Sequence, residues 1–385
     1  MALFKSLQLL KNFSPDVLLY RKFATRIVDF TSSSVHLRYK GKIKEVNNIW
    51  LRDNCHCPKC FNNNTKQKII IPPIIPSKIR AIQADINGTQ LNITWGDGHK
   101  SSYDTDTLFK KTYPKTLPEK QLWDDSSMSK DKLGSSTYDQ IISGDVTNLM
   151  NSLSIHGLGI VENVPTTPED TEKLCESIVP IQNTIFGGFW TFTSDQHRAD
   201  TAYTSLKLGV HTDTSYYVNP MGIQIFHCLH HEGEGGETLL ADGFRAAEEL
   251  RKQNPDYFDI LLKYRVPHVY TGDHGNELYA EHSILSTDCY GQLEGVRYNH
   301  YDRSTILNIP DKDIGTWYKA LKCLSKIMED ESSIFEIKLR PGTTILIDNW
   351  RVLHGRNSFT GKRIMSGCYY LRDDWINLAK RIAST

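Results

Sequence analysis

The sequence lacks the features that mark several common classes of protein. No apolar run approaches the roughly 20 residues that a transmembrane helix needs, so we expect no membrane insertion. Basic and acidic residues balance at 45 each, whereas a nucleic-acid-binding domain normally carries a basic excess, so we expect no nucleic-acid partner. The sequence contains neither a glycine-rich phosphate loop nor a Gly-x-Ser-x-Gly elbow, which removes the commonest nucleotide-binding and serine-hydrolase interpretations.

Cysteine is scarce and unevenly placed. Eight cysteines occur in 385 residues, and three of them are crowded into the segment CHCPKC at positions 55–60. This is not the layout of a small secreted protein held together by disulfides, so we expect a reducing compartment.

The first 25 residues are basic, poor in acids, and apolar at helical spacing (Leu3, Leu7, Leu10 and Phe13). This combination is typical of a mitochondrial transit peptide, and it predicts a leader over residues 1–25 and location in the mitochondrial matrix. The alternative is an ordinary basic helix at the start of a cytoplasmic protein.

The rest of the chain predicts two domains. Short strands separated by turn signals such as Asn87-Gly88 predict a small N-terminal β domain over residues 26–122, and the polar stretch 123–140 predicts a linker. Residues 141–385 mix strands with helices predicted at 168–180, at 242–264 with a break at Pro255, and at 311–330. Because helices do not alternate regularly with the strands, we expect a mainly β, α+β fold: a double-stranded β-helix, or jelly roll, with helices packed on one side.

The cysteine cluster predicts a structural zinc site in the N-terminal domain. Cys55, Cys57 and Cys60 supply three thiolates within six residues, and a closed tetrahedral zinc site needs four ligands. His99, in a turn after the strand LNITW, is the best fourth ligand. His56 lies between two of the cysteines, where its own coordination would be sterically awkward. The alternative is a loop with free thiols.

A second metal site is predicted from residues far apart in the chain. His211 and Asp213 are two positions apart, so an extended segment points both side chains to one side. His354 ends an apolar strand and is the best candidate for the third ligand. Two histidines and one carboxylate on one face of an ion form the facial triad of non-haem Fe(II) oxygenases, which leaves three positions open.

The residues after His354 indicate a cosubstrate for those open positions. The loop GRNSFTGK leads into a second strand that opens with Arg363, and a hairpin of this length returns Arg363 toward His354. A guanidinium there can hold the far carboxylate of 2-oxoglutarate. Thr238 is a plausible hydroxyl partner for the same carboxylate, and Arg356 is a competing cation.

Other histidines compete for the metal. FHCLHHEGE contains His227, His230 and His231, but the zinc-protease spacing His-Glu-x-x-His is absent and these residues fall at a strand end with mixed orientation. We interpret them as residues of strand and loop packing.

Several longer segments resemble one family. WLRDNCHCPKC, TWGDGHKSSY, AYTSLKLGVHTDTSYY, GIQIFHCLHHEGEGGETLLADGF and DNWRVLHGRNSFTGKRIMSGCYYLRDDW are similar to the γ-butyrobetaine dioxygenase and trimethyllysine dioxygenase family of carnitine biosynthesis, and they occur in the family's order. The resemblance implies a jelly-roll catalytic domain, a zinc-binding N-terminal domain, dependence on Fe(II), 2-oxoglutarate and ascorbate, and a homodimer. It also implies the iron ligands His211, Asp213 and His354, the 2-oxoglutarate ligand Arg363, and the zinc ligands named above.

The substrates of both family branches are small molecules that carry a trimethylammonium group. A quaternary cation cannot donate a hydrogen bond, so it is best held by aromatic faces. By position, Trp190 and Tyr203 match the family's aromatic cage, and Phe186 stands near another cage position; the alternative is that these are core aromatics. Asp200 stands where the butyrobetaine branch has a neutral asparagine, and its carboxylate would attract the α-ammonium of trimethyllysine.

The negative charge of Asp200 favours the trimethyllysine branch. The expected reaction is hydroxylation of free N6,N6,N6-trimethyllysine at C3 with O2 and 2-oxoglutarate, which gives 3-hydroxy-trimethyllysine, succinate and CO2. Alternatives are γ-butyrobetaine hydroxylation, action on a methylated protein lysine, and a non-catalytic zinc and cupin interaction module. Asn299 and Tyr301 are candidates for binding the substrate carboxylate.

Overall fold

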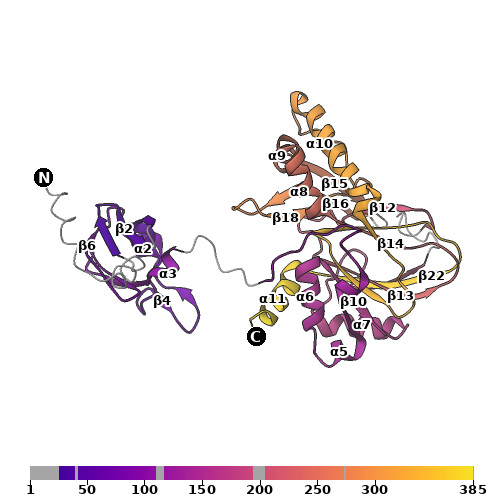
Figure 1. Cartoon of the computed structure of the whole chain (residues 1–385), viewed down its shortest axis with the longest axis horizontal. Coiled ribbons are helices and arrows are strands. Elements are labelled where there is room, and N and C mark those ends of the chain that lie inside the picture. The colour runs from indigo at the N-terminus through magenta and orange to yellow at the C-terminus, as the bar shows by residue number, and fades with distance from the viewer. Residues whose placement is uncertain (1–25, 40–41, 110–116, 194–203, 273–274, 385) are drawn as a thin grey trace, which may run out of the picture. The chain divides into compact units, whose positions relative to one another are not determined.

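The computed structural model describes residues 26–39, 42–109, 117–193, 204–272 and 275–384 (Figure 1). The chain divides into two compact units, Met1–Lys115 and Thr116–Thr385, which are described separately. The predicted leader, residues 1–25, lies outside the described residues. Among the helices that the structure describes, none combines the length and apolar character needed to cross a bilayer.

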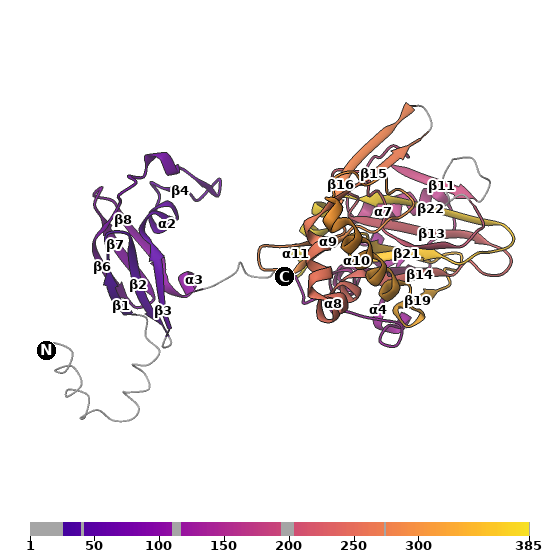
Figure 2. The ribbon, with the colours of Figure 1, turned by 90° about the horizontal axis from the view of Figure 1, so that it is seen from above.

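The first unit contains two antiparallel three-stranded sheets (Figure 2). One holds β1 (Arg26–Phe30), β2 (Ser34–Tyr39) and β3 (Lys42–Asn47), and the other holds β6 (Ala81–Asn87), β7 (Gln90–Trp95) and β8 (Lys100–Asp104). The predicted Asn87-Gly88 turn joins β6 to β7, and Gly88 adopts a φ of 60° there, which glycine accepts without strain.

Shorter elements of the first unit lie between these sheets in the sequence or, for α3, after the second of them. They are α2 (Asn48–Asp53), β4 (Phe61–Asn62), β5 (Gln67–Lys68), the 3-10 turn η2 (Pro72–Ile74) and α3 (Thr105–Phe109). Alternate residues of β2 and β7, among them Val35, Leu37, Leu91, Ile93 and Trp95, form the buried core together with Leu51 of α2. This period of two is what a strand with one buried face produces.

The second unit is built on two facing sheets. The six-stranded sheet has the order β11 (Phe189–Thr193), β22 (Arg363–Tyr370), β13 (Ile223–His231), β20 (Thr344–Asp348), β10 (Leu158–Glu162) and β9 (Ser135–Thr137). The four-stranded sheet has the order β12 (Leu208–His211), β21 (Val352–Arg356), β14 (Thr238–Asp242) and β19 (Ile334–Ile337). Apart from the parallel pair β9 and β10, the strands pair antiparallel, which is the predicted jelly-roll arrangement.

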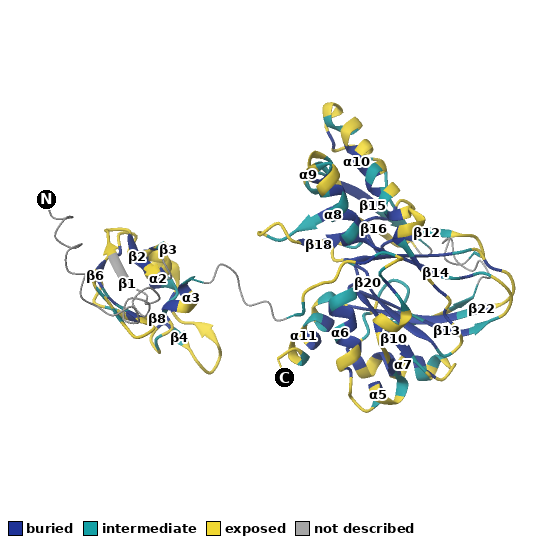
Figure 3. Cartoon of the chain, viewed as in Figure 1, coloured by how far each residue is buried: buried dark blue, intermediate teal, exposed yellow. Residues whose placement is uncertain are grey.

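The core between the sheets follows strand periodicity. Ile345 and Ile347 of β20 point into it, together with Leu240 of β14 and Phe335 of β19. The intervening residue Leu346 points to the opposite face and packs in a separate cluster with helices. Both faces of β20 are therefore buried, as the dark strands at the centre of Figure 3 show, which explains why its sequence is apolar without alternation.

Helices cover the outer faces of both sheets, whereas the sequence predicted helices on one side. α6 (Thr147–His156), α7 (Pro168–Ile178) and α11 (Arg372–Ile382) pack on the six-stranded sheet, and α8 (Gly243–Gln253), α9 (Pro255–Lys263) and α10 (Asp311–Glu329) pack on the four-stranded sheet (Figure 1). The helices at 168–180, at 242–264 with its break at Pro255, and at 311–330 were predicted, whereas α11 was not. The side on which the helices pack was not predicted, because it depends on which sheet each apolar face meets.

Further elements complete the second unit. The hairpins β15 (Arg265–Thr271) with β16 (Glu277–Ser283) and β17 (Leu285–Thr287) with β18 (Leu293–Val296) follow α9, and the 3-10 turn η5 (Glu331–Ser333) precedes β19.

Residues 123–140, predicted as a linker, are part of the second unit. They contain α4 (Lys130–Leu133), β9 and the start of α5 (Tyr138–Ile142). Trp123, Met128 and Leu133 are buried in the core between the sheets, and Trp123 Nε1 donates to the carbonyl oxygen of His156 at 2.7 Å. Although this stretch is polar overall, its three apolar residues are buried against partners that lie far away in the sequence.

Candidate active site

Two histidines come together because their strands are neighbours. His211 ends β12 and His354 lies in the middle of β21, and the two strands pair antiparallel with His211 directly opposite His354. Opposed residues place their side chains on the same face of a sheet, and here the two ring centroids are 4.7 Å apart. Asp213 follows in the turn after β12.

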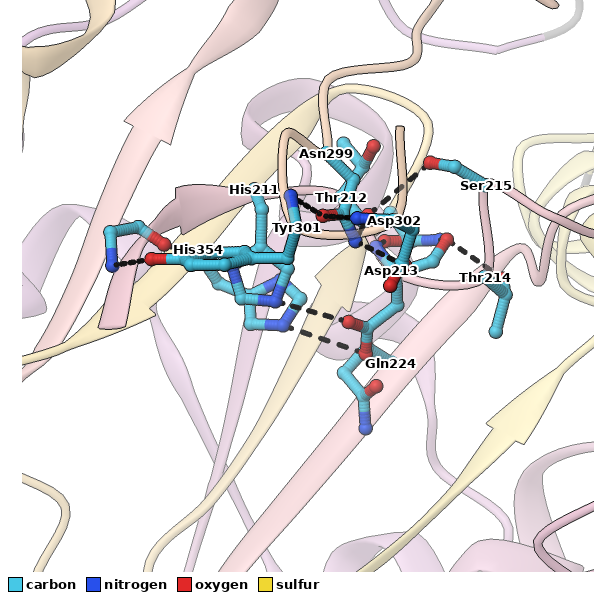
Figure 4. Close-up of polar contacts among 12 residues, drawn as sticks. His211, Thr212, Asp213, Thr214, Ser215, Gln224, Asn299, Tyr301, Asp302 and His354 are labelled. Carbon is cyan, nitrogen blue, oxygen red and sulfur yellow. Dashed lines mark hydrogen bonds and ion pairs between the residues drawn. The ribbon is translucent and has the colours of Figure 1, made fainter. Parts of the chain in front are cut away.

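The carboxylate of Asp213 lies between the two imidazoles. Its Oδ1 is 3.3 Å from His211 Nε2, and its Oδ2 is 3.6 Å from His354 Nε2 (Figure 4). One ligand atom from each of the three residues lies within 4.8 Å of the other two. Two imidazoles and one carboxylate that converge on one point fit a ferrous ion held by a facial triad.

Hydrogen bonds, burial and neighbouring charges orient these groups and shift their pKa values. His211 Nδ1 donates to the carbonyl oxygen of Gly209 at 2.9 Å, which leaves Nε2 as the free ligand atom. Burial lowers the pKa of both imidazoles, but for His211 the hydrogen bond and charge of Asp213 outweigh burial and the pKa is raised, whereas for His354 burial prevails. Burial would raise the pKa of Asp213, yet His354 and His211 together lower it far below its usual range. The carboxylate therefore stays ionised.

The triad faces a cavity of about 380 Å³. This volume suits a small molecule and a cosubstrate rather than a polymer. The predicted residues that line the same cavity are Arg363, Thr238, Trp190 and Phe186, and Asn299 and Tyr301 also reach it.

Arg363 and Arg356 both reach the cavity, but their guanidinium groups differ in what they bind. Nη2 of Arg356 donates to the carbonyl oxygens of Thr204 at 2.6 Å and Leu206 at 2.8 Å. Arg363 is 7% exposed and packs beside the Phe359 ring, and among the described residues no carboxylate lies within ion-pair distance of it. Burial lowers the pKa of Arg363, yet its guanidinium remains the cation that is available to an incoming anion.

Aromatic side chains gather on the side of the cavity formed by β11, β13 and β22. The Trp190 ring centroid lies 5.4 Å from that of Phe192, 5.8 Å from that of Phe226 and 6.2 Å from that of Tyr369. Trp190 lies opposite Gly367, where a Cβ would stand 2.5 Å from the indole, so the glycine makes room for the ring. Phe186 lies edge-on to Tyr270 elsewhere on the cavity wall, at 5.6 Å.

Two family models match most of the chain. Residues 127–369 match "Taurine catabolism dioxygenase TauD, TfdA family", and residues 28–109 match "Gamma-butyrobetaine hydroxylase-like, N-terminal". The chain belongs to the TauD/TfdA dioxygenase family. The predicted class of enzyme, an Fe(II)- and 2-oxoglutarate-dependent dioxygenase with a jelly-roll core, is thereby confirmed.

Named relatives of this TauD/TfdA chain fall into two groups. It is 38% identical to "Trimethyllysine dioxygenase, mitochondrial" of Bos taurus over 89% of this chain and 84% of that protein. It is 36% identical to "Trimethyllysine dioxygenase" of Meyerozyma guilliermondii over 88% of this chain and 90% of that protein. "Gamma-butyrobetaine dioxygenase" of Homo sapiens is 28% identical over 87% of this chain and 89% of that protein.

The N-terminal unit of this TauD/TfdA protein brings the predicted zinc ligands together. His99 Nε2 lies 3.3 Å from Cys55 Sγ and 3.5 Å from each of Cys57 Sγ and Cys60 Sγ. Tyr103 of β8 helps to place the cluster, since its hydroxyl donates to the carbonyl oxygen of Leu51 in α2, just before the cysteines, at 2.6 Å. Three thiolates and one imidazole are a donor set that suits a closed tetrahedral zinc site.

Other predicted residues stand apart from these two clusters. His227 is buried and shares a hydrogen bond with Thr171 Oγ1 at 2.7 Å, and His230 pairs with Glu232 at 2.9 Å. Asp200 and Tyr203 lie outside the described residues.

Sequence reasoning missed Phe226 and Tyr369 as cavity residues, although a signal for Tyr369 was present. Residues 363 and 369 share the same face of β22 because they are an even number of positions apart. Once Arg363 is placed in the cavity, strand parity places Tyr369 there too. Its hydroxyl donates to Asp213 Oδ2 at 2.8 Å.

Proposed function

We propose that this protein hydroxylates free N6,N6,N6-trimethyllysine at C3, with O2 and 2-oxoglutarate, to give 3-hydroxy-trimethyllysine, succinate and CO2. The observation that carries the proposal is the gap between the two groups of relatives: 38% identity to a trimethyllysine dioxygenase against 28% to a γ-butyrobetaine dioxygenase, over nearly the same share of the chain. The runner-up is γ-butyrobetaine hydroxylation.

His211, Asp213 and His354 would hold the ferrous ion, which supplies the redox chemistry with O2 when bound. Asp213 contributes a full negative charge, and the two neutral imidazoles complete a site that leaves room for a chelating cosubstrate. The residues around the ion shape a cavity that restricts water and fixes the substrate relative to the metal. Ascorbate would serve as the accessory reductant.

Arg363 would bind the far carboxylate of 2-oxoglutarate, with Thr238 as a hydroxyl donor to the same group. The support is that Arg363, which is 7% exposed, has no carboxylate within ion-pair distance among the residues that the structure describes. Thr238 begins β14, is 5% exposed and lines the same cavity. A bidentate pair between a guanidinium and a carboxylate would satisfy a charge that is otherwise costly to bury.

The trimethylammonium group would lie against aromatic faces. Trp190 carries this role, with Tyr369 as an additional wall, because both line the cavity beside the triad. Phe186 would close another side. We assign Tyr203 to the same cage and Asp200 to the α-ammonium group by their positions in the sequence. Removing one aromatic face from a desolvated cation costs about 2 kcal/mol.

The remaining assignments concern the whole protein. Cys55, Cys57, Cys60 and His99 would bind structural zinc in the first unit, and the second unit is the catalytic domain. Relatives named as mitochondrial support a mitochondrial location, and the composition of residues 1–25 assigns them as the targeting leader to the matrix. The protein would act as a homodimer on its small-molecule substrate.

The proposal is tested by measuring CO2 release from 2-oxoglutarate with trimethyllysine and with γ-butyrobetaine side by side. We expect kcat/KM for trimethyllysine to exceed that for γ-butyrobetaine by at least about tenfold, the equivalent of one charge-assisted contact to the α-ammonium. A preference for γ-butyrobetaine would favour the runner-up. Release of CO2 with neither compound would contradict both.

Arg363→Met should raise the KM for 2-oxoglutarate about 10- to 100-fold, because it removes a charge-assisted contact worth about 1.5–3 kcal/mol. Steady-state kinetics at saturating trimethyllysine measure it. Arg356→Met is the comparison, since Nη2 of Arg356 already donates to two backbone carbonyl oxygens. A larger increase in the KM for 2-oxoglutarate with Arg356→Met would reverse the assignment of the two arginines.

A further inference from the structure

One buried side chain joins the turn that carries Asp213 to the strand that carries His354. Asn349 lies between β20 and β21, five residues before His354, and is 0% exposed. Its Oδ1 accepts from the backbone N–H of Asp213 at 2.7 Å. Its Nδ2 donates to the carbonyl oxygens of Asp213 and Met221, at 3.0 Å each. Asn349 therefore satisfies both polar groups of the Asp213 backbone at once.

The turn after Asp213 adopts a conformation that needs this support. Thr214 has a φ of 58°, in the left-handed region that a β-branched residue rarely occupies. Its Oγ1 donates to the carbonyl oxygen of Asp213 at 2.7 Å and accepts from the N–H of Met221 at 3.0 Å. A strained conformation of this kind persists only where surrounding contacts over-determine it, and it is commonly found at functional sites.

The carboxylate of Asp213 is held separately from its backbone. Tyr369 donates to Oδ2 at 2.8 Å from β22, whereas Asn349 reaches only the main chain. Tyr369 lies in a strand of the six-stranded sheet and Asn349 in the turn just after another, β20, although Asp213 itself follows a strand of the other sheet. Asn349 thus fixes where the Asp213 backbone stands, and Tyr369 then fixes how the carboxylate is turned.

We propose that Asn349 is a positioning residue for the metal site, which aims Asp213 at the two imidazoles. The role rests on the proposed function only in that the triad binds a divalent metal. Without the amide, the N–H of Asp213 loses its partner, its C=O keeps only the hydroxyl of Thr214, and the turn can relax toward an ordinary φ at Thr214. Asp213 would then no longer meet His211 and His354 at one point. Residues that support metal ligands in this way typically contribute 10- to 100-fold to metal affinity, by order of magnitude.

The test is the affinity of Asn349→Ala for Mn(II), measured on the full chain through loss of the free-ion EPR signal. Mn(II) prefers carboxylate and imidazole over thiolate ligands, so it reports on the triad rather than on the cysteine cluster. We expect binding to weaken about 10- to 100-fold. His354→Ala gives the affinity of a broken triad for comparison. Ser152→Ala is the matched control, since its buried hydroxyl donates to the carbonyl oxygen of Leu158 at 2.7 Å, away from the triad.

The outcomes separate a positioning role from a merely structural one. Ser152→Ala should lower the melting temperature but leave Mn(II) affinity unchanged, whereas Asn349→Ala should change both. If Asn349→Ala does not fold, Asn349→Ser, which retains a hydroxyl in place of the amide, should show the same direction of change in Mn(II) affinity. Affinity within twofold of the wild type in either folded variant overturns the role of Asn349. Equal Mn(II) binding by the wild type and His354→Ala would instead overturn the triad as a metal site, and the positioning role with it.

Discussion

Asp213→Ala is expected to lower turnover of 2-oxoglutarate with trimethyllysine by at least about 10³-fold, the equivalent of several kcal/mol of metal-dependent stabilisation. The substitution removes the only anionic ligand of the triad and leaves two of the three protein ligands that a facial site for ferrous iron needs. It also removes Asp213 Oδ2, which accepts a hydrogen bond from the Tyr369 hydroxyl at 2.8 Å. The measurement is CO2 release and hydroxylated product at saturating 2-oxoglutarate and added Fe(II).

Asp213→Glu separates loss of charge from loss of position. It keeps the carboxylate but extends it by one methylene, so we expect partial Mn(II) binding with turnover still far below that of the wild type. Both variants should keep the wild-type secondary structure by circular dichroism, because Asn349 holds the backbone of residue 213 and not its side chain. Turnover above one tenth of the wild-type value in Asp213→Ala would contradict a role for this carboxylate in binding the catalytic metal.

The sequence was most informative where chemistry and strand geometry coincide. His211 and Asp213 were found as a local pair by their spacing, although only His211 lies in a strand and Asp213 lies in the turn after it. Arg363 does line the cavity, but not through the predicted hairpin, because β21 and β22 belong to different sheets and the loop between them crosses from one sheet to the other. The structure brings the three ligands together through one cross-strand register, His211 opposite His354, which no local pattern specifies. His227, His230 and His231 were set aside in favour of His354 because they fall at the end of one predicted strand, where their side chains would point in different directions.

The features that were missed depend on contacts between distant segments. Trp123 lies in a polar stretch and has no local partner, yet it is buried and donates to His156. Phe226 of β13 meets Trp190 of β11 only because β22 lies between their strands. Hydrophobic periodicity reports that a residue is buried, but not which segment covers it. The sides on which the helices pack were missed for the same reason.

The largest expected change in stability concerns the ion pair that holds the start of the stretch first interpreted as a linker. Arg351 and Asp242 form an ion pair whose side chains are 1% and 0% exposed, with Nε to Oδ1 at 3.1 Å and Nη2 to Oδ2 at 2.8 Å. Asp242 also accepts from the N–H of Trp123, and Arg351 donates to the carbonyl oxygen of Gln121. Asp242→Ala should therefore lower the free energy of unfolding of the second unit by about 3–5 kcal/mol, because it leaves a guanidinium buried without a counter-charge.

Urea unfolding measures the effect, with loss of 2-oxoglutarate turnover as a probe that reports on the second unit alone. The double variant Asp242→Ala/Arg351→Met should recover part of the loss, since it also removes the uncompensated charge. Glu248→Gln is the control: its pair with Arg251, at 3.0 Å, is on the surface of α8, so the change should stay below about 0.5 kcal/mol. A loss in Asp242→Ala no larger than in Glu248→Gln would show that the residues around Trp123 are held by apolar packing alone. The ion pair would then be incidental to their attachment.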